Sequence, residues 1–350
     1  MFKPELWQSH SEYRTFITAF RRRLSRNNPK YHFDSYEKEY QKLLELDLDP
    51  AMEFMSSFYS SGGRPAKNQA QILRSLILFV LLFNRTNAKT SLTSWVRDVL
   101  PNSPVLIGLI GCESAEDLPP LGSYYDFMNR FWLASRTKYS RIATLPAGKN
   151  GKKPKKEIGP DGKLVEPDEP IPDTSDIVSN IMNGLPAKDN PESALQHIFF
   201  LVAVLPSINL GLIDRENLTM SGDGTAVVSH SSPYGKRPAS CPASCTFRKD
   251  CDSRHYSDPD ADWGLDSSNK TWYFGHTLYL LCCRNDELKI ELPLLANFTS
   301  ARRHDSKNFL YAIDDFGRNI YGIFPKTSAW ILPMTTCLHT NCWIIGASTP

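Results

Sequence analysis

The stretch Leu218-Thr-Met-Ser-Gly-Asp-Gly-Thr-Ala-Val-Val228 decides the fold of the second half of the chain. Its apolar and β-branched residues predict a strand, and two glycines flank its one acidic residue, Asp223. Because glycine has no Cβ, a metal could approach the backbone closely beside this carboxylate. Asp223 is therefore a candidate metal ligand. The alternative interpretation is a turn or cap residue, which is the common role of a lone aspartate.

The sequence on both sides of this strand predicts further regular elements. Two apolar runs, Trp272 to Leu281 and Leu288 to Asn297, predict strands. A helix is expected from His304-Asp-Ser-Lys307 to Phe316, with Asp305 as its cap, because aspartate favours the N-cap position. Before the Asp223 strand, residues 194–205 predict a helix.

The first part of the chain has helical periodicity. Tyr13, Phe16, Ile17 and Phe20 recur at the spacing of one helix face. Further helices are expected at 69–80, 91–100 and 124–134. The helix from Gln69 is so apolar that we expect it to be packed.

Composition is that of an ordinary globular protein: 350 residues, 41% hydrophobic, 22% charged and a net charge of +2. The length allows about two domains. The longest apolar runs, 76–83 and 198–205, are much shorter than the roughly 20 residues of a membrane span. Together with a start that lacks a signal-peptide pattern, this predicts a cytoplasmic protein without membrane partners, whose eight cysteines are reduced.

Positive charge is concentrated in two clusters. Candidate DNA-contacting residues are Arg21, Arg22, Arg23, Arg26, Lys152, Lys153, Lys155 and Lys156, together with Arg64 in the turn of residues 62–65. Basic clusters of this kind can bind phosphates. The alternative for each cluster is a solvated face or a linker. Residues 145–175, basic at first and then acidic, contain few large apolar residues and are expected to be a flexible linker.

Three segments together resemble the DDE-type transposases of bacterial insertion sequences. Two lie in the first part of the chain, Gly63-Arg-Pro-Ala with Gln71-Ile-Leu-Arg-Ser-Leu-Ile-Leu, and Pro119 to Trp132. The third, residues 218–316, resembles the opening of the RNase H-like catalytic domain of that family. The resemblance covers a little over half of the chain. His276 departs from the pattern, which has a lysine-like residue in a Gly-Tyr-Lys sequence there.

The resemblance implies an α+β protein that acts on DNA. The implied divisions are a helical DNA-binding and assembly domain (1–144), a linker (145–175), the first part of the RNase H-like domain (176–326) with a polar insert (229–270), and a tail (327–350). It implies Mg²⁺ or Mn²⁺ bound by Asp223 and two further carboxylates, with two metals cleaving and joining DNA. Implied partners are the terminal repeats of the element, target DNA, and a second copy or a full-length transposase, in a nucleoid-associated location.

The tail from Thr327 to Pro350 does not fit this pattern, because it contains no acidic residue and no clear helix or strand period. Tryptophan is encoded only by TGG, and every isoleucine codon begins with AT. A reading frame that begins one base earlier therefore contains GAT, an aspartate codon, where the codons of Trp330 and Ile331 meet. The same reasoning gives aspartate codons where Met334 meets Thr335 and where Trp343 meets Ile344. With permissible codons elsewhere it reads Ile-Cys-Leu-Asp-Ser-Ala-His-Asp, an apolar strand that ends in a carboxylate. We therefore expect a frameshift near Lys326, by mutation or by programmed slippage; a genuinely divergent C-terminus is the alternative.

A cysteine-rich segment lies in the polar insert. Cys241, Cys245, Cys251 and His255 are the residue types that hold a structural Zn²⁺, although their spacing is not that of two Cys-x2-Cys knuckles. Reduced surface cysteines are the alternative. Cys282 and Cys283 are expected in the core.

The sequence therefore predicts a DDE-type transposase without its second and third acidic residues, inactive alone. The rival hypothesis is a non-catalytic DNA-binding product that regulates or inhibits the full-length enzyme.

Overall fold

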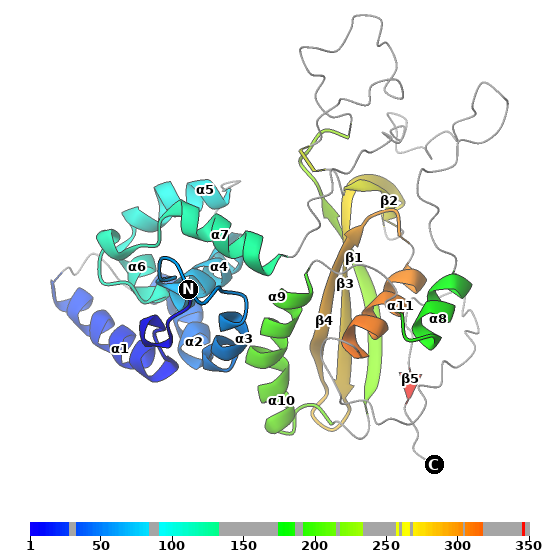
Figure 1. Ribbon diagram of the computed structural model, residues 1–350, viewed down its shortest axis with the longest axis horizontal. Coiled ribbons are helices and arrows are strands. Elements are labelled where there is room, and N and C mark those ends of the chain that lie inside the picture. The colour runs from blue at the N-terminus through cyan, green and yellow to red at the C-terminus, as the bar shows by residue number, and fades with distance from the viewer. Residues whose placement is uncertain are drawn as a thin grey trace, which may run out of the picture. The chain divides into compact units, whose positions relative to one another are not determined.

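The protein is described from a computed structural model, in which the chain divides into two compact units (Figure 1). The helical unit contains Met1–Leu133 and His197–Pro206, and the sheet unit contains Ala134–Gln196 and Ser207–Pro350. The described residues are 1–27, 33–83, 91–132, 174–185, 192–214, 218–233, 257–258, 261–266, 269–303, 305–317 and 345–346. Helices come first and an antiparallel sheet follows, which confirms the α+β class expected from the sequence.

The helical unit is built from short helices that follow one another closely. Its α-helices are α1 (His10–Asn27), α2 (Glu37–Glu45), α3 (Met52–Ser56), α4 (Gln69–Phe83), α5 (Leu92–Ser94), α6 (Pro104–Ile110) and α7 (Leu121–Phe131). Single turns of 3₁₀-helix lie at Pro4–Leu6, Phe33–Tyr36, Asp49–Ala51, Leu100–Asn102 and Ala115–Asp117, and a π-helical turn at Trp95–Val99 extends α5. The helices predicted at 91–100 and 124–134 are therefore confirmed, with shifted ends.

Helix α1 confirms the periodicity read from the sequence. Tyr13, Ile17 and Phe20 are buried, and Phe16 is half-buried. The Tyr13 hydroxyl donates a hydrogen bond of 2.7 Å to the carbonyl oxygen of Leu109. This bond satisfies the one polar group that the apolar face of α1 carries into the core.

Helix α4 is packed, as its apolar sequence predicts. Ile72, Leu73, Leu78 and Leu82 are buried, whereas Val80 is 68% exposed. Val80 is exposed because helical geometry turns one side of even an apolar helix toward solvent.

The remaining helices and the strands begin at residue 174. The helices are α8 (Thr174–Met182), α9 (Ser193–Phe199), a π-helical turn (Phe200–Val204), α10 (Leu205–Asn209) and α11 (Asp305–Asp315). The strands are β1 (Thr219–Val228), β2 (Asp262–Asp266), β3 (Thr271–Asn285), β4 (Ile290–Ser300) and β5 (Ile345–Gly346). The helix expected at 194–205 is confirmed, and so are the strands expected at 218–228, 272–281 and 288–297.

The long strand β3 is the centre of the sheet. It pairs antiparallel with β1 on one side, with Asp223 opposite Leu280, and with β4 on the other, with Ala296 opposite Leu280. Strand β2 pairs with the first residues of β3, so it lies on the β4 side. Strand β5, from the segment where no period is visible, pairs with Thr219 and Met220 of β1.

Strand β2 lies within the polar insert of residues 229–270, where the sequence did not predict a strand. Gly264 at its centre leaves room for the backbone and Cβ of Ala301, where a larger side chain would collide. The strand therefore depends on a distant part of the chain, and its five residues carry no strong strand pattern of their own.

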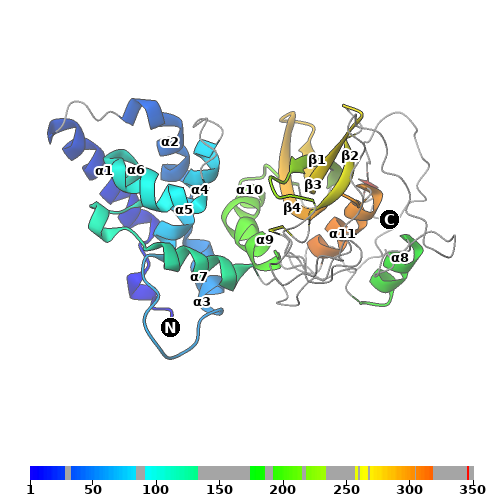
Figure 2. The same ribbon diagram turned by 90° about the horizontal axis from the view of Figure 1, so that it is seen from above.

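Helices pack on the sheet and along its edge (Figures 1 and 2). Leu310 and Tyr311 of α11 form a buried cluster with Ile177 of α8. At the outer edge of β4, the Ala296 amide donates to Gln196 Oε1 at 3.2 Å and the Phe298 amide donates to Glu192 Oε1 at 3.3 Å. These side chains satisfy backbone groups that an edge strand would otherwise expose.

Candidate functional site

Asp223 lies in the middle of β1 with its side chain exposed. The backbone amide of Gly224 donates a hydrogen bond of 2.9 Å to Asp223 Oδ1. Successive side chains of a strand point to opposite faces of the sheet, so Asp223 points away from the face on which the positions of Gly222 and Gly224 lie. Its carboxylate can therefore reach a ligand from solvent.

The two flanking glycines have a structural explanation. A Cβ at Gly222 would collide with the hydroxyl of Tyr279, and a Cβ at Gly224 would collide with the carboxylate of Asp305. Tyr279 is fully buried, and Asp305 is the first residue of α11. The space beside the backbone, which the sequence suggested for a metal, is thus filled by these two side chains on the face away from Asp223.

The buried hydroxyl of Tyr279 is held in its protonated form. Burial raises the pKa of Tyr279, and the negative charges of Asp305 and Asp223 raise it further. Asp305 is the first residue of α11, so it lies inside the first turn, one position after the N-cap that the sequence predicted for it.

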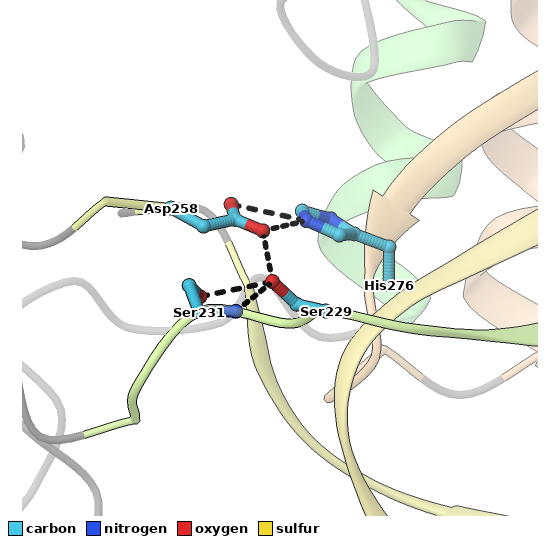
Figure 3. Close-up of polar contacts among 4 residues, drawn as sticks. All are labelled: Ser229, Ser231, Asp258 and His276. Atoms are coloured by element: carbon cyan, nitrogen blue, oxygen red, sulfur yellow. Dashed lines mark hydrogen bonds and ion pairs between the residues drawn. The ribbon is translucent and has the colours of Figure 1, made fainter. Parts of the chain in front are cut away.

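A second polar cluster contains Ser229, which directly follows β1, Asp258, which precedes β2, and His276 of β3 (Figure 3). The Asp258 carboxylate accepts a hydrogen bond of 2.6 Å from the Ser229 hydroxyl and lies 3.0 Å from His276 Nε2. The His276 ring is stacked on Phe298, with ring centroids 4.4 Å apart. Ser231 completes the cluster through a 2.9 Å contact between its hydroxyl and that of Ser229.

The arrangement of this cluster suits a structural role, in which Ser229 and His276 hold the Asp258 carboxylate in place. The carboxylate stands between the serine and the histidine, so the imidazole faces Asp258 and does not activate the Ser229 hydroxyl as a base would. Burial alone would raise the pKa of Asp258, but hydrogen bonds from Ser229 and His276 outweigh it, and the pKa is lowered. The cluster therefore holds an ionised carboxylate against β3.

The carboxylates near the end of α11 point into the protein. Asp314 and Asp315 are buried, and Asn297 Nδ2 donates a hydrogen bond of 3.0 Å to Asp315 Oδ2. Beside them the Thr299 hydroxyl donates to Asn308 Oδ1 at 3.1 Å. Because both aspartates are buried, they are poor candidates for a catalytic carboxylate.

The arginines of α1 divide into two groups. Arg21 Nη2 lies 2.8 Å from Glu37 Oε2, and its guanidinium lies 4.6 Å from the centre of the Tyr40 ring. Arg23 pairs with Glu113. Arg22 and Arg26 are exposed, as is Arg64 in its turn. Two of the five arginines predicted to contact DNA therefore have partners inside the protein.

The remaining candidate residues lie outside the described part of the chain. They are Lys152, Lys153, Lys155, Lys156, Cys241, Cys245, Cys251 and His255. Within the described ranges, no three histidine, cysteine, aspartate or glutamate side chains gather closely enough to hold a metal, and no helix is long and apolar enough to cross a membrane. Cys283 is buried and Cys282 half-buried, as expected for core residues. Burial raises the pKa of Cys283 to about 11, so its thiol is unreactive.

Sequence reasoning missed Asp258 and Tyr279 as partners of the predicted residues. Asp258 follows the cysteine-rich segment in a turn-rich stretch, and Tyr279 looks like any apolar strand residue. The alternation of β3 places Tyr279 on the same face as Thr277 and Leu281, which is the one signal that marks it as a core residue. Comparison with models of protein families, with curated proteins and with solved structures finds no match for this chain.

Proposed function

We propose that this chain is a DNA-binding protein of the DDE transposase type, in which Asp223 is the first metal-binding carboxylate of an RNase H-like domain. The observation that carries the proposal is the order of elements around Asp223. Three long strands, β1, β3 and β4, form an antiparallel sheet, the helix α11 follows at once, and the exposed carboxylate stands in the middle of the first strand.

The ligand chemistry fits one carboxylate of such a site. A carboxylate oxygen is a ligand that Mg²⁺ and Mn²⁺ prefer, and Asp223 is accessible from solvent. Two-metal cleavage of a phosphodiester needs further carboxylates beside it, and the described residues do not gather a group of three potential ligands. We therefore derive no cleavage step, and we propose that this chain alone does not carry out strand transfer.

A second function follows from the same observations. A chain that binds the ends of an element without cutting them would repress or poison a complete transposase that needs the same ends. The exposed arginines of α1 favour this regulatory role, because they lie in the helical unit and do not depend on the residues around Asp223.

Footprinting tests the proposal. The purified chain is incubated with a labelled duplex that carries the DNA flanking its gene, with and without Mg²⁺, and Asp223→Asn serves as the control. We expect protection of a discrete sequence and no strand cleavage. A chain that binds no duplex would refute the DNA-binding function. Mg²⁺-dependent cleavage that the Asp223→Asn variant lacks would instead show a complete catalytic site and contradict the proposed inactivity.

The coding sequence tests the frameshift hypothesis separately. An open reading frame one base earlier than the codon of Lys326, continuing with acidic residues, supports it. Stop codons immediately downstream in that frame would overturn it.

A further inference from the structure

The solvent-facing side of α1 has an unusual composition. At about 100° per residue, seven residues fall within roughly 60° on either side of one line along the helix. These residues, which we name the arginine stripe, are Ser11, Arg14, Thr15, Thr18, Arg22, Ser25 and Arg26. Thr18 is half-buried and the other six are exposed. α1 runs along the rim of the helical unit, with its apolar side toward the core (Figures 1 and 2).

The two arginines that lie beside the stripe are paired with acidic residues, and the arginines of the stripe are not part of these pairs. Arg21 on one flank is paired with Glu37, and Arg23 on the other is paired with Glu113. Both acidic side chains are thus occupied by arginines that are not part of the stripe. The stripe itself contains no acidic residue, so its three positive charges are directed outward together.

Small hydroxyl side chains fill the space between the stripe's arginines. The Thr15 and Thr18 hydroxyls donate hydrogen bonds of 2.9 Å and 2.7 Å to carbonyl oxygens one turn earlier in the helix. Short side chains held against the backbone let a large partner approach the helix closely. Serine and threonine hydroxyls are also common contacts of nucleic-acid phosphates.

The chemistry of the stripe favours a polyanion over a protein partner. A protein interface usually depends on large aromatic or aliphatic anchors that become buried, and the stripe has none. Arg14 and Arg22 are eight residues apart, which is about 12 Å along a helix. That separation is close to the width of the DNA major groove, about 12 Å, which can admit a helix.

We propose that the arginine stripe is the surface through which this chain binds duplex DNA, with Arg14, Arg22 and Arg26 each contacting a phosphate. The inference rests on the proposed function, that the chain acts on DNA. It adds Arg14 to the DNA-contacting residues and removes Arg21 and Arg23, which are paired with Glu37 and Glu113.

Salt dependence of binding provides the test. Affinity of the full chain for a fluorescent duplex of its flanking DNA is measured by anisotropy between 50 and 200 mM salt, a range over which phosphate contacts change affinity strongly. The variant is Arg14→Gln with Arg22→Gln and Arg26→Gln. The charge-matched control is Arg97→Gln with Lys270→Gln and Arg284→Gln, three exposed positions elsewhere.

Each lost phosphate contact reduces the slope of log affinity against log salt by about 0.9, so the stripe variant should show a slope shallower by about 2.7. The control should keep the slope of the wild type. Circular dichroism and the melting temperature verify that both variants fold. A stripe variant that binds DNA as the wild type does would overturn the inference and leave the proposed function intact. A wild-type chain that binds RNA or an acidic polypeptide but no duplex DNA would overturn both.

Discussion

The helical unit and the sheet unit differ in which charged side chains they bury. In the helical unit Arg14, Arg22 and Arg26 of α1 are exposed, whereas Arg74 of α4 is 1% exposed and its guanidinium lies over the Tyr13 ring. In the sheet unit Asp314 and Asp315 of α11 are buried and Asp258 is paired with His276, whereas Asp223 of β1 is exposed.

This difference shows which functional residues can be read from a local pattern. A helix face that binds a polyanion is a surface property, and periodicity alone describes it. The role of a carboxylate in the sheet depends on which strand or helix lies against it, and that is decided by residues far away in the sequence.

The largest effect on stability is expected at Gly275, where the neighbouring backbone leaves no space for a side chain. A Cβ at Gly275 would collide with the backbone of Val227 and Val228 in β1 and of Ser229, which directly follows β1. Gly275→Ala should therefore destabilise the sheet unit by about 3 kcal/mol, the upper end of the usual range for overpacking. Urea unfolding followed by circular dichroism measures this change.

The matched control lies in the helical unit. A Cβ at Gly122 of α7 would meet nothing within 4 Å, so Gly122→Ala should leave stability within about 1 kcal/mol of the wild type. Equal effects of the two substitutions would contradict the close approach of β1 to β3.

The next effect concerns the buried carboxylate of the sheet unit. Asp315→Ala leaves the amide of Asn297, itself fully buried, without the partner it donates to. We expect a loss of about 2–3 kcal/mol in the free energy of unfolding. In a double-mutant cycle with Asn297→Ala, a coupling energy near zero would show that the two side chains do not interact.

A smaller, pH-dependent effect is expected at Asp258. Its pKa is lowered in the folded protein, so its contribution to stability is fully present above the ordinary value near 3.9 and is lost as the pH falls through the lowered folded value. At pH 7, Asp258→Asn should cost about 1 kcal/mol, the typical worth of one hydrogen bond. The melting temperatures of the wild type and of Asp258→Asn, measured between pH 2.5 and 7, should converge at the acidic end. A difference that stays constant over this range would contradict a stabilising role of the ionised Asp258 carboxylate.

The smallest effect is expected at Asp223. Its side chain is exposed and accepts a hydrogen bond from the neighbouring Gly224 amide. Asp223→Asn should change stability by less than about 0.5 kcal/mol, as surface substitutions usually do. A loss of several kcal/mol would assign Asp223 a structural role and remove the main support for its proposed role as a metal ligand.

The sequence predicted the parts of the fold that local patterns control. Tyr13, Ile17 and Phe20 marked the buried face of α1, and the apolar runs marked β3 and β4. Strand β2 was not predicted, because its place depends on the fit of Gly264 against Ala301. Long-range packing of this kind leaves no trace in a short window of sequence.

The candidate site was predicted to a smaller extent. The residues next to Asp223 in the sequence identified it as a candidate. The side chains that leave no space for a Cβ at its two flanking glycines are Tyr279 and Asp305, which come from β3 and α11. The ion pairs that occupy Arg21 and Arg23 likewise join α1 to acidic residues of other segments. A cluster of like charges in the sequence does not show which of its members are paired.

Arginine-selective labelling with phenylglyoxal tests the central claim most directly, because it reports each guanidinium separately. The chain is labelled with and without a saturating duplex of its flanking DNA, and the modified peptides are quantified by mass spectrometry. We predict that Arg14, Arg22 and Arg26 react in the free chain and are protected by DNA, whereas the exposed Arg97 and Arg302 react equally in both. Unchanged labelling of the three stripe arginines while the DNA is bound would contradict the account.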